Sequence, residues 1–146
     1  MSLTVAPFET RHLEAAAAIE RVSFSLPWSR DMLKEELESH QTLYLAAEQG
    51  GELAGYCGMR IVLGEGYITN VATAPGYRRR GIASLLLKEL MSRGRALGLS
   101  FMTLETRVSN SAAIALYEKH GFERIGIHPG YYEKPREDAL IMTIIM

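Results

Sequence analysis

The chain has 146 residues, which predicts one domain over residues 1–146 with room for a sheet covered by helices. Lysines and arginines number 16 against 17 aspartates and glutamates, so no global basic field recruits nucleic acid. A single cysteine, Cys57, excludes an internal disulfide, and no apolar run reaches the ~18 residues of a membrane span or forms a signal peptide. We therefore expect a cytoplasmic protein that binds no membrane and has no direct contact with nucleic acid.

Apolar periodicity and turn residues predict seven strands and four helices. The expected strands cover residues 3–9, 42–49, 52–63, 65–73, 100–108, 122–128 and 138–146. The expected helices cover residues 11–24, 30–40, 81–97 and 110–120. Ser29 should cap the second helix, and either Ser109 or Asn110 the fourth, because their side-chain oxygens accept main-chain hydrogen bonds. A loop carrying Gly130, Tyr131 and Tyr132 is expected between the last two strands.

The order of these elements predicts a mixed sheet in the α/β class. Strand–helix–strand units around residues 66–128 require parallel pairing, whereas the Gly50-Gly51 hairpin requires antiparallel pairing. Helices are expected on both faces of the sheet.

Three consecutive arginines stand where the strand over residues 65–73 leads into a helix. Arg78, Arg79 and Arg80 are followed by Gly81, which lets a ligand approach the main chain closely. A helix start offers free N–H groups and guanidinium groups bind phosphate oxygens, so the junction suits a pyrophosphate. A solvated basic turn is the alternative. The pattern is neither a P-loop nor the Rossmann fingerprint.

The segment VATAPGYRRRGIASLLLKEL resembles the acyl-CoA-binding segment of the GCN5-related N-acetyltransferases (GNAT), whose pattern Arg/Gln-x-x-Gly-x-Gly/Ala is matched from Arg78 to Ala83. The segments LETRVSNSAAIALYEKHGF, FSLPWS and GYYEKPREDALIM are similar to the ribosomal-protein-alanine N-acetyltransferases, which acetylate the N-terminal alanine of protein S18. The resemblance covers nearly the whole chain. It implies the GNAT fold, with a mostly antiparallel sheet of about seven strands, and acetyl-CoA as cosubstrate without a metal. It also implies a protein N-terminus, that of S18, as acceptor, and a monomer or weak homodimer.

Two residues carry the chemistry that the resemblance implies. Glu105 lies between apolar neighbours in its strand, where a carboxylate is costly unless it pairs with an arginine or serves as a base. Tyr117 alone would be read as a core residue. The resemblance makes Glu105 the general base, helped by burial that raises its pKa, and Tyr117 the general acid for the CoA thiolate.

The cosubstrate contacts implied by the resemblance are mostly main-chain groups. A bulge near Val71 is expected to separate the fourth strand from the fifth, with the Val71 N–H polarising the thioester carbonyl. Asn110, seven residues before Tyr117 and on the same helix face, would bind the pantetheine or phosphate arm. The full set is Val71, Ala72, Thr73, Arg78, Arg79, Arg80, Gly81, Ile82, Ala83, Ser84, Asn110 and Tyr117.

Large aromatic residues in predicted loops mark the acceptor side. Trp28, Tyr131 and Tyr132 would each read singly as caps on the core, but the resemblance places them with Glu105 around the acceptor peptide. A related acetyltransferase for a small amine or a lysine remains an alternative. A non-catalytic acyl-CoA sensor is another, which the presence of both Glu105 and Tyr117 disfavours. The four histidines show no metal-binding spacing, so we expect structural or surface roles for them.

Overall fold

The structure is a computed structural model and describes residues 2–146. Its strands are β1 (Leu3–Pro7), β2 (Thr42–Gln49), β3 (Glu52–Val62), β4 (Glu65–Thr73), β5 (Phe101–Arg107), β6 (Glu123–Tyr132) and β7 (Glu137–Ile145). Its helices are α1 (Leu13–Ser23), α2 (Arg30–Glu38), α3 (Ile82–Ala96) and α4 (Ser111–Lys119), with short 3₁₀ turns η1 (Thr10–His12) and η2 (Pro75–Tyr77). None of the helices in residues 2–146 combines the length and apolar character needed to cross a bilayer.

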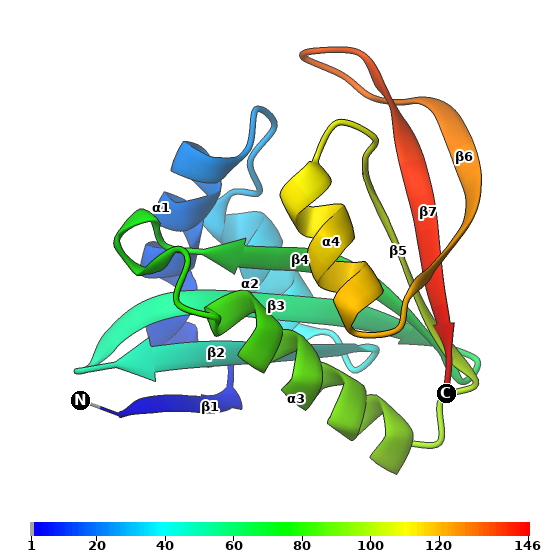
Figure 1. Cartoon of the computed structure of the whole chain (residues 1–146). Helices are drawn as coiled ribbons and strands as arrows, with labels where there is room; N and C mark the ends of the chain where they lie inside the picture. The colour runs from blue at the N-terminus through cyan, green and yellow to red at the C-terminus, as the bar shows by residue number, and fades with distance from the viewer. Residues whose placement is uncertain (1) are drawn as a thin grey trace.

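The strands form one sheet in the order β1-β2-β3-β4-β5-β7-β6. Over the described chain, β4 and β5 are the one parallel pair, and the other neighbours are antiparallel. The parallel pairing runs from the Glu65–Phe101 row to the Tyr67–Thr103 row, after which the two strands diverge (Figure 1). The prediction of a mixed, mostly antiparallel sheet is confirmed, and the divergence leaves an opening between β4 and β5.

The expected parallel pairing of the strands on either side of α4 is wrong. β7 lies between β5 and β6 and is antiparallel to both. The reason is burial: Ala139, Leu140 and Met142 of β7 are buried, whereas β6 is mostly exposed and includes Ile125 and Ile127 at the surface. The more apolar strand takes the inner position, and β6 becomes the edge.

Helices cover both faces of the sheet, as predicted (Figure 1). Between the sheet and α3 and α4 lies an apolar layer that includes Leu86, Leu87, Leu90, Met102, Leu104 and Tyr117. Between the sheet and α1 and α2 lies a second layer that includes Leu13, Ala16, Leu33, Tyr44 and Tyr56. We call these two sides the α3/α4 face and the α1/α2 face.

Local sequence signals set most helix boundaries. Ser29 accepts a hydrogen bond from the Met32 N–H (3.2 Å), and Asn110 accepts one from the Ala113 N–H (3.2 Å), so both N-caps are confirmed. The predicted Gly130–Tyr132 loop is wrong, because β6 continues to Tyr132, which pairs with Glu137 after a register shift. That shift lets the hairpin resume its ladder beyond the irregularity.

Candidate active site

The start of α3 has the features of an anion site. Gly81 is the N-cap, with φ at +75°, a left-handed conformation that favours glycine. Within residues 2–146 no side chain caps this end, so the first-turn N–H groups of Ile82, Ala83 and Ser84 are available to a ligand. The partial positive charge of the helix end adds to their attraction for phosphate oxygens.

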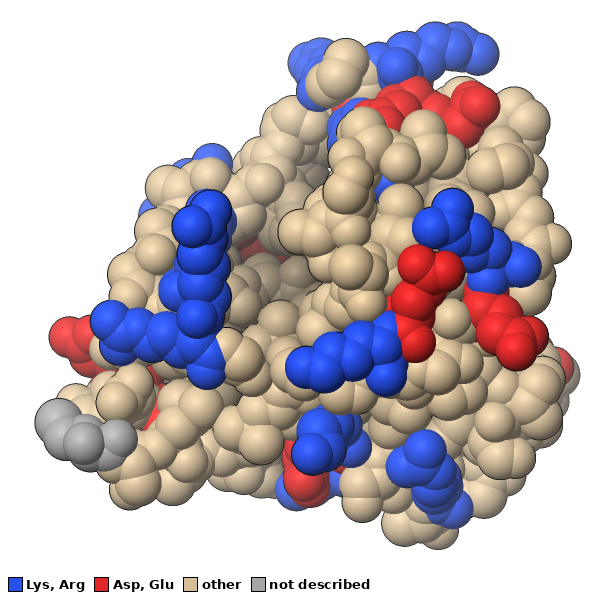
Figure 2. Space-filling view, viewed as in Figure 1, with Lys and Arg blue, Asp and Glu red and all other residues tan. Residues whose placement is uncertain are grey.

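The three predicted arginines lie exposed beside this helix start. The Arg78 guanidinium donates to the Ser23 hydroxyl (3.0 Å), and the Arg80 guanidinium lies 5.5 Å from the centre of the Tyr77 ring. Figure 2 shows Lys and Arg side chains gathered over the loop before α3, next to a hollow that extends toward α4. The exposed arginines therefore lie next to the free N–H groups at the start of α3.

The last residues of β4 present main-chain donors to the opening. The Ala74 N–H donates to the Ala54 carbonyl (2.8 Å), and an antiparallel ladder alternates the direction of successive N–H groups. The N–H groups of Val71 and Thr73 therefore point away from β3, toward the gap that β5 leaves. A bulge lies at Thr69, where the register with β3 shifts, two residues before Val71.

Glu105 lies on β5, and its environment differs from the prediction. Strand alternation turns Leu104 and Thr106 into the α3/α4 face and Glu105 toward the α1/α2 face, where 31% of its side chain is exposed. The expected burial of this carboxylate is therefore wrong. Its ion-pair partner is also not an arginine: Glu105 Oε2 lies 2.8 Å from His128 Nδ1.

Tyr117 lies on α4 and approaches the opening from the other face. Its side chain is 7% exposed, and its ring packs against Phe122 with 5.8 Å between ring centres. Burial, with a smaller effect from Tyr132, raises the pKa of its hydroxyl, so Tyr117 stays protonated at neutral pH. Asn110 is the N-cap of α4, two turns before Tyr117 along the chain.

The predicted acceptor aromatics lie on the same side as Glu105. Trp28 lies in the loop between α1 and α2, where its side chain packs on the buried residues of the α1/α2 face. Its main-chain N–H donates a hydrogen bond to Glu20 Oε1 (2.9 Å). The Tyr132 hydroxyl donates to the main-chain oxygen of Glu105 (3.0 Å), and burial raises the pKa of Tyr132 to about 12. The Tyr131 ring is half exposed and lies 4.7 Å from the His128 ring, measured between centres.

Sequence reasoning missed two residues around this carboxylate. His128 was assigned only a structural or surface role, although its ring meets Glu105. The second is Arg107, whose guanidinium stacks on Tyr132 (4.6 Å to the ring centre) and donates to Glu137 and to the main chain of the β6–β7 turn. Arg107 is two positions after Glu105 on the same strand, a spacing that places both side chains on one face and is the sequence signal for its role.

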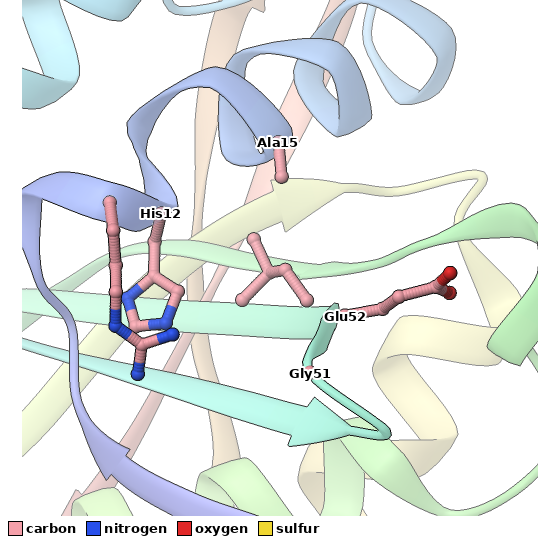
Figure 3. A pocket seen from close by; sticks show the side chains of 6 residues that line it. His12, Ala15, Gly51 and Glu52 are labelled. Carbon is pink, nitrogen blue, oxygen red and sulfur yellow. The ribbon is translucent and has the colours of Figure 1, made fainter.

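A separate hollow of about 380 Å³ lies where η1 and α1 meet the β2–β3 turn. Figure 3 shows His12 and Ala15 facing that turn at Gly51. The predicted site residues do not line it, and its charged groups are paired, since Glu48 binds Arg11 and Tyr77 binds Glu52. The predicted residues lie instead on α3, β4, β5 and α4, the elements next to the place where β4 and β5 diverge, which is therefore the candidate active site.

An anion site at a helix start and a carboxylate on the opposite face of the sheet are features compatible with an acyltransferase. Residues 13–122 match the family model described as "Acetyltransferase (GNAT) family". The chain belongs to this family, and it is an acetyl-CoA-dependent N-acetyltransferase.

Known relatives cover nearly the whole chain. The "[Ribosomal protein bS18]-alanine N-acetyltransferase" of Escherichia coli (strain K12) is 36% identical over 143 residues, or 97% of this chain and 96% of the relative. The "N-alpha-acetyltransferase RimI" of Mycobacterium tuberculosis is 36% identical over 120 residues, 80% of this chain and 74% of the relative. The crystal structure of the ribosomal-protein-S18-alanine N-acetyltransferase from Escherichia coli superposes with a TM-score of 0.92 at 35% identity, covering 99% of this chain and 94% of that one.

Proposed function

We propose that this enzyme transfers an acetyl group to the N-terminal α-amine of a protein, with the N-terminal alanine of ribosomal protein bS18 as the acceptor. The observation that carries the proposal is the placement of Glu105 and Tyr117 on opposite faces of the sheet at the β4–β5 opening. The names of the Escherichia coli relatives, at 36% identity across nearly the full chain, support bS18 as the acceptor.

The cosubstrate supplies an activated acetyl group as a thioester. Glu105 takes a proton from the acceptor ammonium group, directly or through water, and so frees the amine lone pair to form the new C–N bond. The Val71 N–H donates to the thioester carbonyl oxygen as negative charge develops there. The C–S bond breaks, and Tyr117 gives its proton to the departing thiolate sulfur.

The residues present fit a coenzyme A pyrophosphate. We assign the pyrophosphate to the N–H groups of the α3 start, from Gly81 to Ser84, with Arg78, Arg79 and Arg80 as supporting charges. Ala72 and Thr73, at the end of β4, and Asn110 would contact the pantetheine arm. The Asn110 side-chain oxygen caps α4, so its amide N–H₂ is the group we assign to the ligand.

The acceptor peptide would lie against the α1/α2 face, where Trp28, Tyr131 and Tyr132 offer aromatic surface beside Glu105. The partner is a protein N-terminus, which a cytoplasmic enzyme would meet as ribosomal proteins are made. We propose that residues 1–146 act as one domain and as a monomer or weak homodimer.

A competition between two amines in one peptide tests this function. The peptide carries the free N-terminal alanine of bS18 and an internal lysine, and mass spectrometry locates the acetyl group after reaction with acetyl-CoA. We expect modification of the α-amine. Acetylation confined to the lysine, or turnover only with small amines, would reject the proposed acceptor. Acetyl-CoA binding with no turnover on any amine would favour the sensor.

A further inference from the structure

His128 makes a specific contact with the proposed base. Its Nδ1 lies 2.8 Å from Glu105 Oε2, although the two residues come from strands that are not neighbours in the sheet. An ionised carboxylate can only accept hydrogen bonds, so the His128 Nδ1 must carry the hydrogen. Among residues 2–146, His128 is the one hydrogen-bond partner of the Glu105 carboxylate. The bond uses Oε2, so Oε1 can accept a hydrogen bond from an amine.

The sheet register explains how the two side chains meet. Arg107, Ala139 and His128 form one row across β5, β7 and β6, while Glu105 lies two rows away, opposite Ile141. Residues in paired positions project on the same face. Ala139 carries only a methyl group, so the His128 ring can lean across β7 toward Glu105 without a clash.

Neighbouring groups hold this pair in place. The Tyr131 ring packs on the His128 imidazole, and the Tyr132 hydroxyl binds the main-chain oxygen of Glu105 (3.0 Å). The β6 register shift between His128 and Tyr132 brings both tyrosines to this side of the hairpin. A glutamate has three rotatable side-chain bonds, and a fixed partner selects one of their combinations.

We propose that His128 is a positioning residue that holds the Glu105 carboxylate so that Oε1 faces the acceptor amine. The proposal deepens the proposed function, because it requires Glu105 to be the base. A pair that is 51% and 31% exposed contributes little to stability. The contact should therefore affect the rate of acetyl transfer and leave the melting temperature nearly unchanged.

The test uses His128→Ala and His128→Asn, because an asparagine amide N–H₂ can occupy nearly the position of the imidazole Nδ1–H. Single-turnover transfer to the alanine peptide is measured beside the acetyl-CoA Kd and a thermal melt. We expect His128→Ala to slow transfer at least about fivefold, since a misplacement of ~1 Å can cost ~10²-fold. Acetyl-CoA affinity should not change, and His128→Asn should recover most of the rate. His40→Ala, at an exposed histidine on another part of the surface, is the control.

A double-mutant cycle that combines His128→Ala with Glu105→Gln tests whether His128 affects the transfer rate through Glu105. If His128 acts through Glu105, adding His128→Ala to Glu105→Gln causes no further loss. Additive losses, a wild-type rate in His128→Ala, or an asparagine variant as slow as the alanine variant would each overturn the inference.

Failure of the proposed function has a different signature. It appears in the wild type as the absence of α-amine acetylation, or in Glu105→Gln as an unchanged rate. Failure of the His128 assignment alone leaves wild-type acetylation of the α-amine and the Glu105→Gln loss in place.

Discussion

The two sides of the opening between β4 and β5 are built differently. On the α3/α4 face, the anion site is one continuous run of chain, from Thr73 to Ser84, whose donors are main-chain N–H groups. On the α1/α2 face, Glu105 meets His128 and Tyr132 through contacts between β5 and β6, which are not sheet neighbours. The proposed cosubstrate site thus depends on local backbone geometry, whereas the proposed acceptor side depends on side chains brought together by packing.

This contrast predicts different responses to mutation. Most side-chain replacements leave main-chain N–H donors in place. Acetyl-CoA affinity should therefore fall mainly when a substitution changes the backbone conformation or the charge of the cosubstrate side. On the acceptor side, proton transfer depends on single side-chain atoms. Even conservative replacements there should therefore slow acetyl transfer strongly.

The largest effect should come from Glu105→Gln, which keeps the shape of the side chain and removes the base. We expect kcat/KM for the alanine peptide to fall by ~10²–10⁴-fold, the usual contribution of general acid–base catalysis. The acetyl-CoA Kd from calorimetry should stay near the wild-type value. Glu123→Gln, at an exposed carboxylate near the start of β6, is the matched control. An unchanged rate in Glu105→Gln would show that water or another residue is the base.

Tyr117→Phe should have the next largest effect, because it removes the proposed acid and keeps the packed ring. We expect single-turnover transfer to slow at least about tenfold with acetyl-CoA affinity unchanged. Because burial raises the pKa of Tyr117, its proton should not be lost until the pH is well above the ordinary tyrosine value. No loss of wild-type activity should therefore arise from Tyr117 between pH 7 and 9.

The control for that variant is Tyr67→Phe, at a tyrosine that binds Glu65 near the other end of β4. A Tyr117→Phe enzyme that melts much earlier but transfers at full rate per folded molecule would show that the residue is structural only.

Substitutions at Gly81 test the role of main-chain donors on the cosubstrate side, with acetyl-CoA affinity as the measured quantity. Gly81→Asn and Gly81→Asp both tolerate the left-handed conformation, but only aspartate places a negative charge at the helix start. Charge at a helix end is worth up to ~2 kcal/mol, so the aspartate variant should bind acetyl-CoA about tenfold more weakly than the asparagine variant. Arg78→Ala should have a smaller effect. A calorimetric ranking with Arg78→Ala as the weakest binder would contradict the main-chain account.

The smallest effect on catalysis should come from Glu48→Gln, remote from both sides of the opening. Glu48 accepts hydrogen bonds from Arg11 (2.6 Å) and His12 (3.0 Å), and the Arg11 bond chiefly lowers its pKa to about 2. Its folded pKa lies below the unfolded value, so its contribution to stability is present above about pH 4.5 and is lost as the pH falls toward 2.

The variant should therefore melt earlier than the wild type at pH 7, and the two melting curves should converge near pH 2. Transfer per folded molecule should equal that of the wild type. A constant difference in melting temperature across this pH range would show that the carboxylate's ionisation is not the cause.

Sequence patterns predicted the cosubstrate side of the molecule in more detail than the acceptor side. The strand over 65–73, the helix after Gly81 and the cap at Asn110 agree with the structure. On the acceptor side, the burial of Glu105 and the loop conformation of Tyr131 and Tyr132 were predicted wrongly. The errors occur where a residue's environment depends on a strand distant in the sequence.

The sequence by itself determined the helices, their caps and the glycine at the start of α3, because each depends on interactions within about four residues along the chain. Only the tertiary structure decided that β7 lies between β5 and β6, since that order depends on which strand buries more apolar surface. It also decided that β4 and β5 diverge beyond Tyr67, and that His128 reaches Glu105 over Ala139. These features follow from strand order and register, which no short segment of the sequence encodes alone.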